Sequence, residues 1–376
     1  MAKFVWDRLT EITAADVPEL TTEIIFCDEF NKTIEPNVLP DSLESIKLGF
    51  YFNQLIGENV LPNSLISIDF GWKFNRSIGE NVLPNSLKYV KFAYGFIQPI
   101  GENVLPDSLE TIEFGHYFNQ PVGENVLPNS LKTVEFGYDF NQPIGENVLP
   151  NSLKTIRFGR YFNQPIGENV LPNSLKNIEF GHKFNRSIGK NVLPNSLKSV
   201  KFGYNFNQLI GENVLPGHLE LIRFGRRFNQ SIGENVLPRS IKCVEIGMYG
   251  RSPSAYDHSI STLYDLNHLE RITLYTKNYI EIDVDRLPHS LKYLYTSNPD
   301  IVLSLNPESQ RMWFSVILIE LPSLLDVTYP ILRPLSCKYD EKYEVIGTKT
   351  IDGSEYNILI NPEFYQPRSN AKSARK

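Results

Sequence analysis

The chain has 376 residues, 12% of them aromatic, and carries a formal net charge of −6 at neutral pH. This acidic balance excludes a global basic field that would recruit nucleic acid or anionic lipid. Cys27, Cys243 and Cys337 are widely spaced and show no metal-ligand pattern, so we expect a reducing, cytoplasmic setting. Residues 1–20 lack the apolar core of a signal peptide, and no apolar run approaches the length of a membrane helix. We therefore expect neither secretion nor contact with a membrane.

One unit of 22 residues repeats along most of the chain, as residues 140–161 illustrate with F-N-Q-P-I-G-E-N-V-L-P-N-S-L-K-T-I-R-F-G-R-Y. Its leading phenylalanine recurs without insertion or deletion at Phe30, Phe52, Phe74, Phe96, Phe118, Phe140, Phe162, Phe184, Phe206 and Phe228. A fixed period of this size indicates a solenoid, in which each coil buries its apolar side only by stacking on its neighbours.

Within one coil, the spacing Leu153-x-x-Ile156-x-Phe158 alternates between buried and outward positions, which predicts a short strand. One strand per coil, always in the same direction, predicts a long parallel sheet. Pro150 and Gly145 interrupt the return path, and proline inside a helix costs about 3 kcal/mol. We therefore expect a non-helical return of extended or 3₁₀ backbone.

Two asparagine columns follow the same period, and we interpret both as ladders of amides that bond the adjacent backbone and each other. The first column follows each leading phenylalanine, from Asn31 to Asn229, and is interrupted by Ile97. The second column runs from Asn37 to Asn235 without interruption.

The pattern divides the chain into five segments. They are an N-terminal half-coil and cap at 1–29, ten repeats at 30–247, a loop with degenerate repeats at 248–329, a C-terminal cap at 330–365, and a disordered basic tail at 366–376.

Several finer features are expected within these segments. Trp6 and Phe4 are placed to shield the first coil. Worn strands are expected at 269–274 and 291–294, and a weaker one at 324–327. In the C-terminal cap, two strand-like runs flank Asp352-Gly353, which predicts a β-hairpin.

The signature Phe-Asn-x-x-Ile, followed by Leu-Pro-x-Ser-Leu-x-x-Ile-x-Phe-Gly, resembles the FNIP repeat across residues 17–247. That family is allied to leucine-rich repeats and is abundant in social amoebae and giant amoeba-infecting viruses. The resemblance implies a curved solenoid with its sheet on the concave face, and protein interaction without known catalysis. Several viral members carry an F-box before the repeats, but the residues ahead of Val17 are too few for that domain.

The residues themselves also predict no enzyme, no cofactor and no metal. The sequence lacks a phosphate-binding glycine loop, a zinc-binding histidine motif and a nucleophile elbow. His116 and His182 share one repeat position but lie three coils apart, about 14 Å, too far to bind one metal. Asp257-His258-Ser259 is the one compact set of catalytic residue types, and adjacent residues seldom converge as a triad.

A column of glutamates raises the alternative of a calcium site, because its carboxylates would be about 5 Å apart. We favour a solvated charged edge that resists aggregation. The column comprises Glu58, Glu80, Glu102, Glu124, Glu146, Glu168, Glu212 and Glu234.

The positions that vary between coils are the candidates for recognition. They are the outward strand residues and the residues after the strand glycine, and the latter are mostly aromatic or basic, types that are enriched in interfaces. The alternative is structural, since charges can pair across strands and rings can stack into a stabilising strip. The predicted partner-binding residues are Trp72, Tyr94, His116, Tyr138, Arg157, Arg160, His182, Tyr204, Arg223 and Arg226.

Two functions remain open at this point. One is a scaffold that binds an unidentified protein on the concave sheet, a host protein if the chain is viral. The other is a nucleic-acid or carbohydrate binder that uses the same rings and arginines. The net acidity and the interspersed Glu113, Glu135 and Glu179 argue against nucleic acid.

Overall fold

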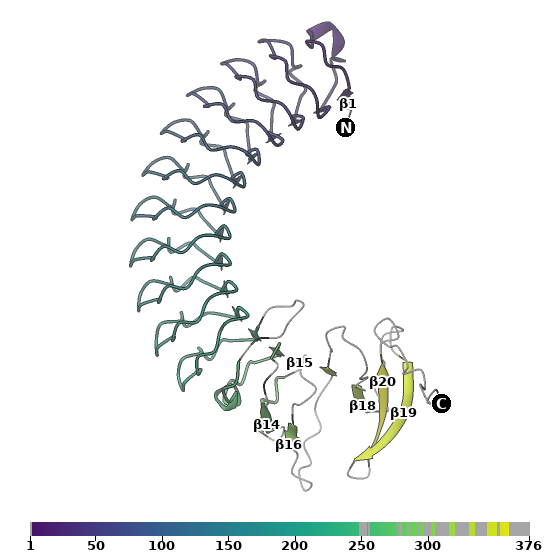
Figure 1. The fold of residues 1–376 in the computed structure, drawn as a ribbon, viewed down its shortest axis with the longest axis vertical. Coiled ribbons are helices and arrows are strands. Elements are labelled where there is room, and N and C mark those ends of the chain that lie inside the picture. Colours follow the sequence, from purple (N-terminus) through teal and green to yellow (C-terminus); the bar gives the residue numbers. More distant parts are fainter. Residues whose placement is uncertain are drawn as a thin grey trace, which may run out of the picture. The chain divides into compact units, whose positions relative to one another are not determined.

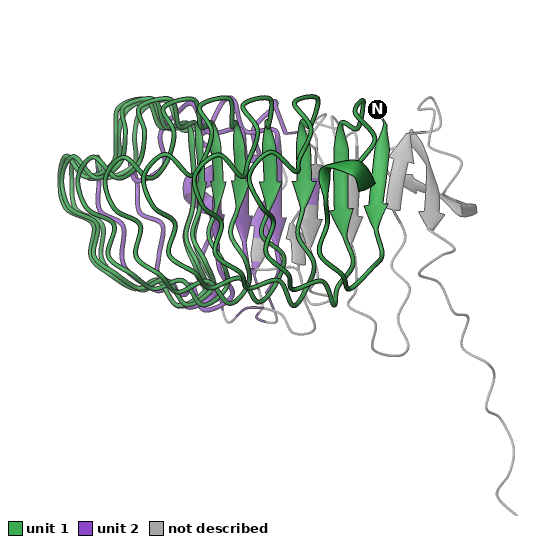
Figure 2. Cartoon of the chain, turned by 90° about the horizontal axis from the view of Figure 1, so that it is seen from above, with its two compact units in different colours: residues 1–203, 213–219 green, residues 204–212, 220–376 purple. Residues whose placement is uncertain are grey.

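A computed structural model describes residues 2–247, residue 254, and residues 256–296 with gaps at 277, 279, 284–285 and 292. Beyond residue 296 it describes only strands β16 to β20. The chain forms two compact units, coloured separately in Figure 2. Unit 1 comprises Met1–Gly203 and Asn213–Leu219, and unit 2 comprises Tyr204–Glu212 and Glu220–Lys376.

Unit 1 is a parallel solenoid with one strand per coil, as the repeat predicts. Each strand pairs in parallel with the next, in a register that places equivalent residues of neighbouring coils side by side, for example Ile156 beside Ile178. The strands are β1 (Lys3–Trp6), β2 (Glu23–Phe26), β3 (Ser45–Lys47), β4 (Ser67–Asp69), β5 (Tyr89–Lys91), β6 (Thr111–Glu113), β7 (Thr133–Glu135), β8 (Thr155–Arg157), β9 (Asn177–Glu179) and β10 (Ser199–Lys201).

The N-terminal end of unit 1 is covered by an additional strand. β1 pairs with β2, so the range 1–29 holds a complete strand pair where the sequence indicates a half-coil. Trp6 is buried at 2% exposure, and the guanidinium of Arg8 lies 5.3 Å from the centre of its ring. Phe4 lies 6.3 Å from Trp6 between ring centres, so both expected shielding residues are at this end.

The return paths are non-helical, as expected from their prolines and glycines. In the described residues the helical elements are two short 3₁₀ turns, η1 (Ala14–Asp16) and η2 (Ser261–Leu263). No helix in that part of the chain combines the length and the apolar character that crossing a membrane requires. Figure 1 shows the coils of unit 1 following a curve, with the strands on its inner side and the returns on its outer side.

Two columns of stacked phenylalanines run through the core, beside buried leucines, isoleucines and valines, and account for this curvature. The column that contains Phe158, directly after strand β8, has ring centres 5.4–5.8 Å apart. The column of leading phenylalanines, which contains Phe140, has ring centres 6.1–6.3 Å apart. Strands pair at about 4.8 Å. Each coil is therefore a wedge that is thinnest at the sheet, which bends the stack toward its strands.

Two polar ladders tie each coil to the preceding one. In the first asparagine column, the side-chain oxygen of Asn141 accepts a hydrogen bond from the backbone N–H of Asn163 at 2.8 Å, which confirms the predicted ladder. In the Leu-Pro-x-Ser phrase, the hydroxyl of Ser152 donates to the carbonyl of Leu131 at 2.6 Å, and equivalent serines do the same along unit 1. These bonds satisfy backbone groups that a non-helical return would otherwise leave unpaired.

The second asparagine column is not a ladder, which corrects our interpretation of it. From Asn37 to Asn235 these residues are exposed and adopt φ of 57–64°, the left-handed region. Asparagine tolerates this conformation better than other residues that have a side chain, apart from aspartate. Asparagine therefore recurs at this position because every coil repeats the same left-handed turn there.

The glycine after each strand is required by the close approach of neighbouring coils. A Cβ on Gly159 would lie 1.6 Å from the carbonyl oxygen of Gly137 in the preceding coil. Ala93 is the one residue that replaces this glycine between β3 and β10, and the glycine of the preceding coil, Gly71, has a φ of +72°. We infer that the altered turn at Gly71 makes room for the methyl group of Ala93.

Unit 2 contains further parallel coils and then an antiparallel sheet. Strands β13 and β15 overlap the worn strands predicted at 269–274 and 291–294, and β19 and β20 pair as the predicted hairpin. The parallel strands are β11 (Leu221–Phe224), β12 (Cys243–Ile246), β13 (Arg271–Leu274), β15 (Tyr293–Thr296) and β17 (Val316–Ile319), with β14 (Glu281–Asp283) beside β16 (Val302–Ser304). The antiparallel strands are β18 (Ile331–Pro334), β20 (Ser354–Ile360) and β19 (Glu344–Ile351).

Three of the sequence predictions fall on other parts of unit 2. The strand that follows β15 in the sheet is β17, whereas the strand expected at 324–327 lies outside the described residues. The predicted turn Asp352-Gly353 and the tail at 366–376 also lie outside them.

Candidate interaction surface

The last residue of each strand from β3 to β10 has its side chain pointing away from the core. Together these residues form a charged column along the inner, concave side of unit 1. The predicted cross-strand pairing is present. Lys91 lies 3.8 Å from Asp69, and Lys201 lies 3.8 Å from Glu179. Arg157 pairs with Glu135 and also lies 3.9 Å from Glu179. Exposed pairs of this kind contribute about 0.2–1 kcal/mol each.

Tyr89 adds to this column a hydrogen bond from an uncharged donor. Its hydroxyl donates to a carboxylate oxygen of Glu113 at 2.8 Å across one strand boundary. Partial burial raises the pKa of the Tyr89 hydroxyl, and the bond to Glu113 raises it further, so Tyr89 stays protonated as the donor. The carboxylate of Glu113 therefore has a partner although its strand neighbour, Glu135, is also acidic.

The residues after the strand glycines form a continuous stack of rings, which we call the ring strip: Phe50, Trp72, Tyr94, His116 and Tyr138. Ring centres are 3.9 Å apart between Trp72 and Tyr94 and 4.2 Å apart in the next two pairs. Interplanar angles in these three pairs are 8–19°, so each inner ring has both faces covered by its neighbours. These distances are close to the spacing of about 4.8 Å between paired strands.

Cations lie at both ends of the ring strip. The guanidinium of Arg160 lies over the ring of Tyr138, 5.2 Å from its centre. The ammonium of Lys73 lies 6.0 Å from the centre of the Phe50 ring. A cation over an aromatic face contributes about 0.5–1 kcal/mol at an exposed site. His182, in the coil after Arg160, is half-buried.

A second row of rings flanks the ring strip and was missed in the sequence prediction. Tyr51 and Tyr117 each follow a strip residue by one position, Tyr161 follows Arg160 in the same way, and all three are 44–52% exposed. Tyr117 meets Tyr94 edge-on at 5.1 Å between ring centres, and Tyr161 meets Tyr138 in the same way at 5.4 Å. The second residue after the glycine varies between coils, and its aromatic identity in three of them was the available signal.

The remaining predicted binding residues belong to unit 2. Arg226 donates to the hydroxyl of Tyr204 at 2.9 Å and also lies over its ring, 5.5 Å from the centre. Arg227 lies 5.8 Å from the same ring. Arg223 pairs with Glu245 on the adjacent strand. Unit 2 therefore has its own small group of arginines around one tyrosine.

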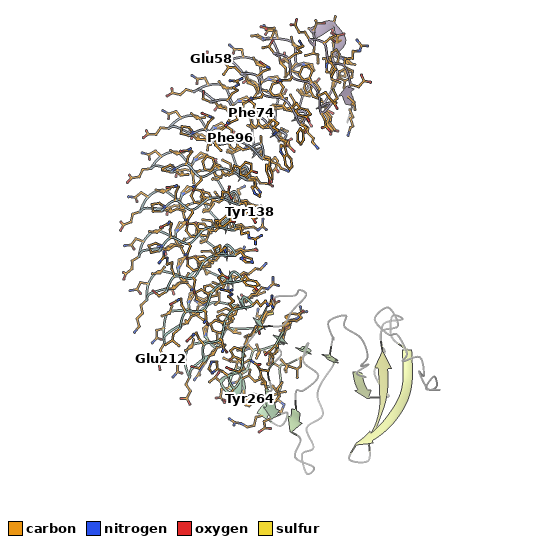
Figure 3. All side chains as sticks on the ribbon, viewed as in Figure 1. Glu58, Phe74, Phe96, Tyr138, Glu212 and Tyr264 are labelled. Carbon is orange, nitrogen blue, oxygen red and sulfur yellow. The ribbon has the colours of Figure 1, made fainter. Side chains whose placement is uncertain are left out.

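The glutamates of the column that belong to unit 1 lie on the opposite side of its coils from the strands. Figure 3 shows Glu58 projecting from the outer side, Phe74 and Phe96 inside the coils, and Tyr138 toward the inner side. The glutamates of this column are exposed. Among the described residues, no group of three or more His, Cys, Asp or Glu side chains is arranged to hold a metal ion.

The candidate catalytic residues do not form a reactive arrangement. His258 lies 3.6 Å from Asp257, while the hydroxyl of Ser259 accepts a hydrogen bond from the backbone N–H of Ser261.

Burial raises the pKa of the Cys243 thiol to about 11, with a further contribution from Glu245, so this thiol is protonated at neutral pH.

Comparisons with known proteins agree with the repeat architecture. The FNIP Repeat family matches residues 11–51, 52–95, 96–139, 140–183, 184–226 and 206–249. The crystal structure of the giant-virus protein CroV588, described as a novel circular LRR protein structure, is 42% identical to this chain and superposes with a TM-score of 0.71. The match covers 84% of this chain and 49% of CroV588, so this chain spans about half the length of that protein. No curated protein sequence matches the chain.

Proposed function

Because the chain belongs to the FNIP repeat family, we propose that it is a non-catalytic scaffold that binds another protein through the inner side of its solenoid. The repeat fold supports an interaction role in general terms, since stacked coils create an extended surface whose variable positions specify the partner. The ring strip and the charged column are the parts of that surface on which the proposal rests.

The observation that carries the proposal is the closed stacking of the ring strip. A nucleic-acid base or a sugar ring binds an aromatic side chain through a free ring face. In the strip, neighbouring rings cover the faces of Trp72, Tyr94 and His116, and Arg160 covers the far face of Tyr138. A closed stack presents the edges of its rings, and Trp72, Tyr94 and Tyr138 carry N–H and O–H groups, which suit the mixed apolar and polar contacts of a protein interface.

The same geometry disfavours the alternative function, a nucleic-acid or carbohydrate binder that uses the strip. Such a ligand would have to separate stacked rings before it could intercalate, and an aromatic pair contributes about 0.5–1.5 kcal/mol beyond its buried area. We further propose that the partner is met in a reducing, cytoplasmic compartment, since Cys27 and Cys243 are both free thiols.

The test is affinity capture from a cell lysate, with bound proteins identified by mass spectrometry. We expect the triple variant Trp72→Ala, Tyr94→Ala and Tyr138→Ala to lose the principal partner, because interface energy concentrates in a few aromatic anchors. Thermal unfolding should show that the triple variant still folds, since the phenylalanine core is intact.

The matched control changes Glu124, Glu146 and Glu168 to Gln on the outer side. This control should retain the partner. If the glutamine control loses the partner while the alanine variant keeps it, the binding face is the outer one and the proposal is wrong.

A further inference from the structure

The outward residues of the four coils β7 to β10 carry an excess of positive charge that the rest of the inner side of unit 1 lacks. We call this region the basic patch. Its cations are Lys132, Lys154, Lys176, Lys198, Arg157, Lys201, Arg160 and Lys183, and its carboxylates are Glu135, Asp139 and Glu179.

The four coils that precede the patch, β3 to β6, are balanced in charge at the equivalent positions. Their cations are Lys47, Lys73, Lys88 and Lys91, and their carboxylates are Glu44, Asp69, Glu110 and Glu113. The coils of β3 to β6 therefore have four cations and four carboxylates, whereas the basic patch has eight cations and three carboxylates. The chain as a whole has a net charge of −6, so the patch is a local reversal of sign.

The charges of the patch are neutralised unevenly. On the strands, Arg157 and Lys201 pair with the carboxylates of Glu135 and Glu179. In the position just before the strands, Lys132 bonds a carboxylate oxygen of Glu110 at 2.6 Å. The next two lysines in that row, Lys154 and Lys176, are exposed and form no ion pair among the described residues.

Lys154 and Lys176 lie directly before the adjacent strands β8 and β9, at neighbouring positions where like charges disfavour each other. The backbone N–H of Lys176 donates to the carbonyl of Lys154 at 2.8 Å, which fixes the two residues side by side at the spacing of the sheet. Like charges at such neighbouring positions are destabilising. An anionic group that binds between them would remove this repulsion and gain the attraction of both ammonium groups.

We propose that the basic patch binds an acidic segment of the partner protein, with Lys154 and Lys176 as its central contacts. This inference rests on the proposed function and specifies the chemistry of the partner. The rest of the chain has a net negative charge, which disfavours an acidic segment in general and so favours its approach to the patch. An acidic protein segment is favoured over nucleic acid because the adjoining ring strip offers no free face for a base.

The experiment measures binding of a fluorescein-labelled poly-glutamate peptide to the full chain by fluorescence polarisation at increasing NaCl. We expect Lys154→Glu with Lys176→Glu to weaken binding by about tenfold or more at low salt, and the wild-type affinity to fall as salt rises. The matched control, Lys32→Glu with Lys190→Glu, changes the net charge equally at exposed positions outside the patch. It should bind the peptide within about twofold of the wild type.

Three results would overturn the inference. These are a wild type that fails to bind poly-glutamate, a patch variant that binds it as well as the wild type, and a control variant that loses binding equally. The inference would also be overturned, in favour of nucleic acid, if a single-stranded RNA of matched charge bound the wild type more tightly than the peptide and did not bind the patch variant. The proposed function is tested by a different experiment, the affinity capture from lysate with the alanine variant of the ring strip. That experiment does not use the peptide, so the failure of one proposal can be distinguished from the failure of the other.

Discussion

The interior of unit 1 and its outward surface are built from the same strands, yet they vary in opposite ways. Inside, Phe140 and its equivalents stack at 6.1–6.3 Å in every coil, and the serine bonds recur with nearly the same length. Outside, the residue after each glycine changes from Trp72 to Tyr94, His116 and Arg160. The comparison indicates that the repeated residues provide stability and the variable residues provide recognition, so substitutions should separate the two.

The largest expected effect is the loss of a core ring in the middle of the stack. Phe140 is fully buried between Phe118 and Phe162, and Phe140→Ala should lower the free energy of unfolding by about 3–5 kcal/mol. Phe30 stacks on one leading phenylalanine, Phe52, so Phe30→Ala should cost less. The comparison of denaturant midpoints checks this, and equal losses at both sites would contradict a solenoid in which each coil depends on its neighbours.

A methyl group at the strand glycine should be nearly as damaging. Gly159→Ala places a Cβ against the carbonyl of Gly137 and forces the two coils apart, at a cost of about 1–3 kcal/mol or more. Gly145→Ala in the same coil is the control, because its Cβ would meet only Val148 at 3.9 Å. Thermal unfolding should place Gly145→Ala close to the wild type. If both variants melt together, the close approach at Gly159 is not what requires glycine.

A ring of the strip should contribute less to stability than a core ring. Tyr94→Ala removes stacking on Trp72 and His116 and should lower the free energy of unfolding by about 1–2 kcal/mol. Tyr94→Phe keeps the stack and should be close to neutral in chemical denaturation. A loss at Tyr94→Ala as large as that at Phe140→Ala would mean that the strip is a structural column and would weaken the case for recognition.

The smallest expected effect is a gain from repairing the asparagine ladder. Ile97 has no side-chain acceptor for the backbone N–H of Asn119, the position that is bonded in the neighbouring coils, and its own side chain is 43% exposed. Ile97→Asn should restore that bond and raise the free energy of unfolding by about 0.5–1.5 kcal/mol. A loss of several kcal/mol in urea unfolding would show that this coil packs its Ile97 side chain as part of the core.

The sequence predicts the repeated features well because each coil solves the same packing problem. The period, the buried Ile156 and the stacking distance in the ring strip all follow from one strand per coil at a fixed spacing. The second asparagine column was misinterpreted because a ladder and a left-handed turn both require asparagine at every repeat. Only the backbone angle at Asn147 and its equivalents distinguishes the two.

Features that occur in a few coils were harder to predict. Tyr51, Tyr117 and Tyr161 were missed because they are aromatic in scattered coils and form no periodic column. The strand β1 was missed because Lys3–Trp6 lacks the Phe-Asn pair and the Leu-Pro-x-Ser phrase that mark a coil. The unequal neutralisation of Lys132 and Lys154 depends on side-chain distances that no pattern of residue types contains.

The wedge-shaped coil with its constant phenylalanine also has a consequence for how the gene can change. Deleting the codons for residues 140–161 would join Asp139 to Phe162 and place Phe118 on Phe162, the same contact that Phe118 now makes with Phe140. The core would be shorter by one coil but unchanged in kind, whereas Tyr138 would acquire His182 as its neighbour in place of Arg160. Unequal recombination between such similar DNA segments would therefore shuffle the recognition surface in whole steps, without any new mutation having to preserve the core.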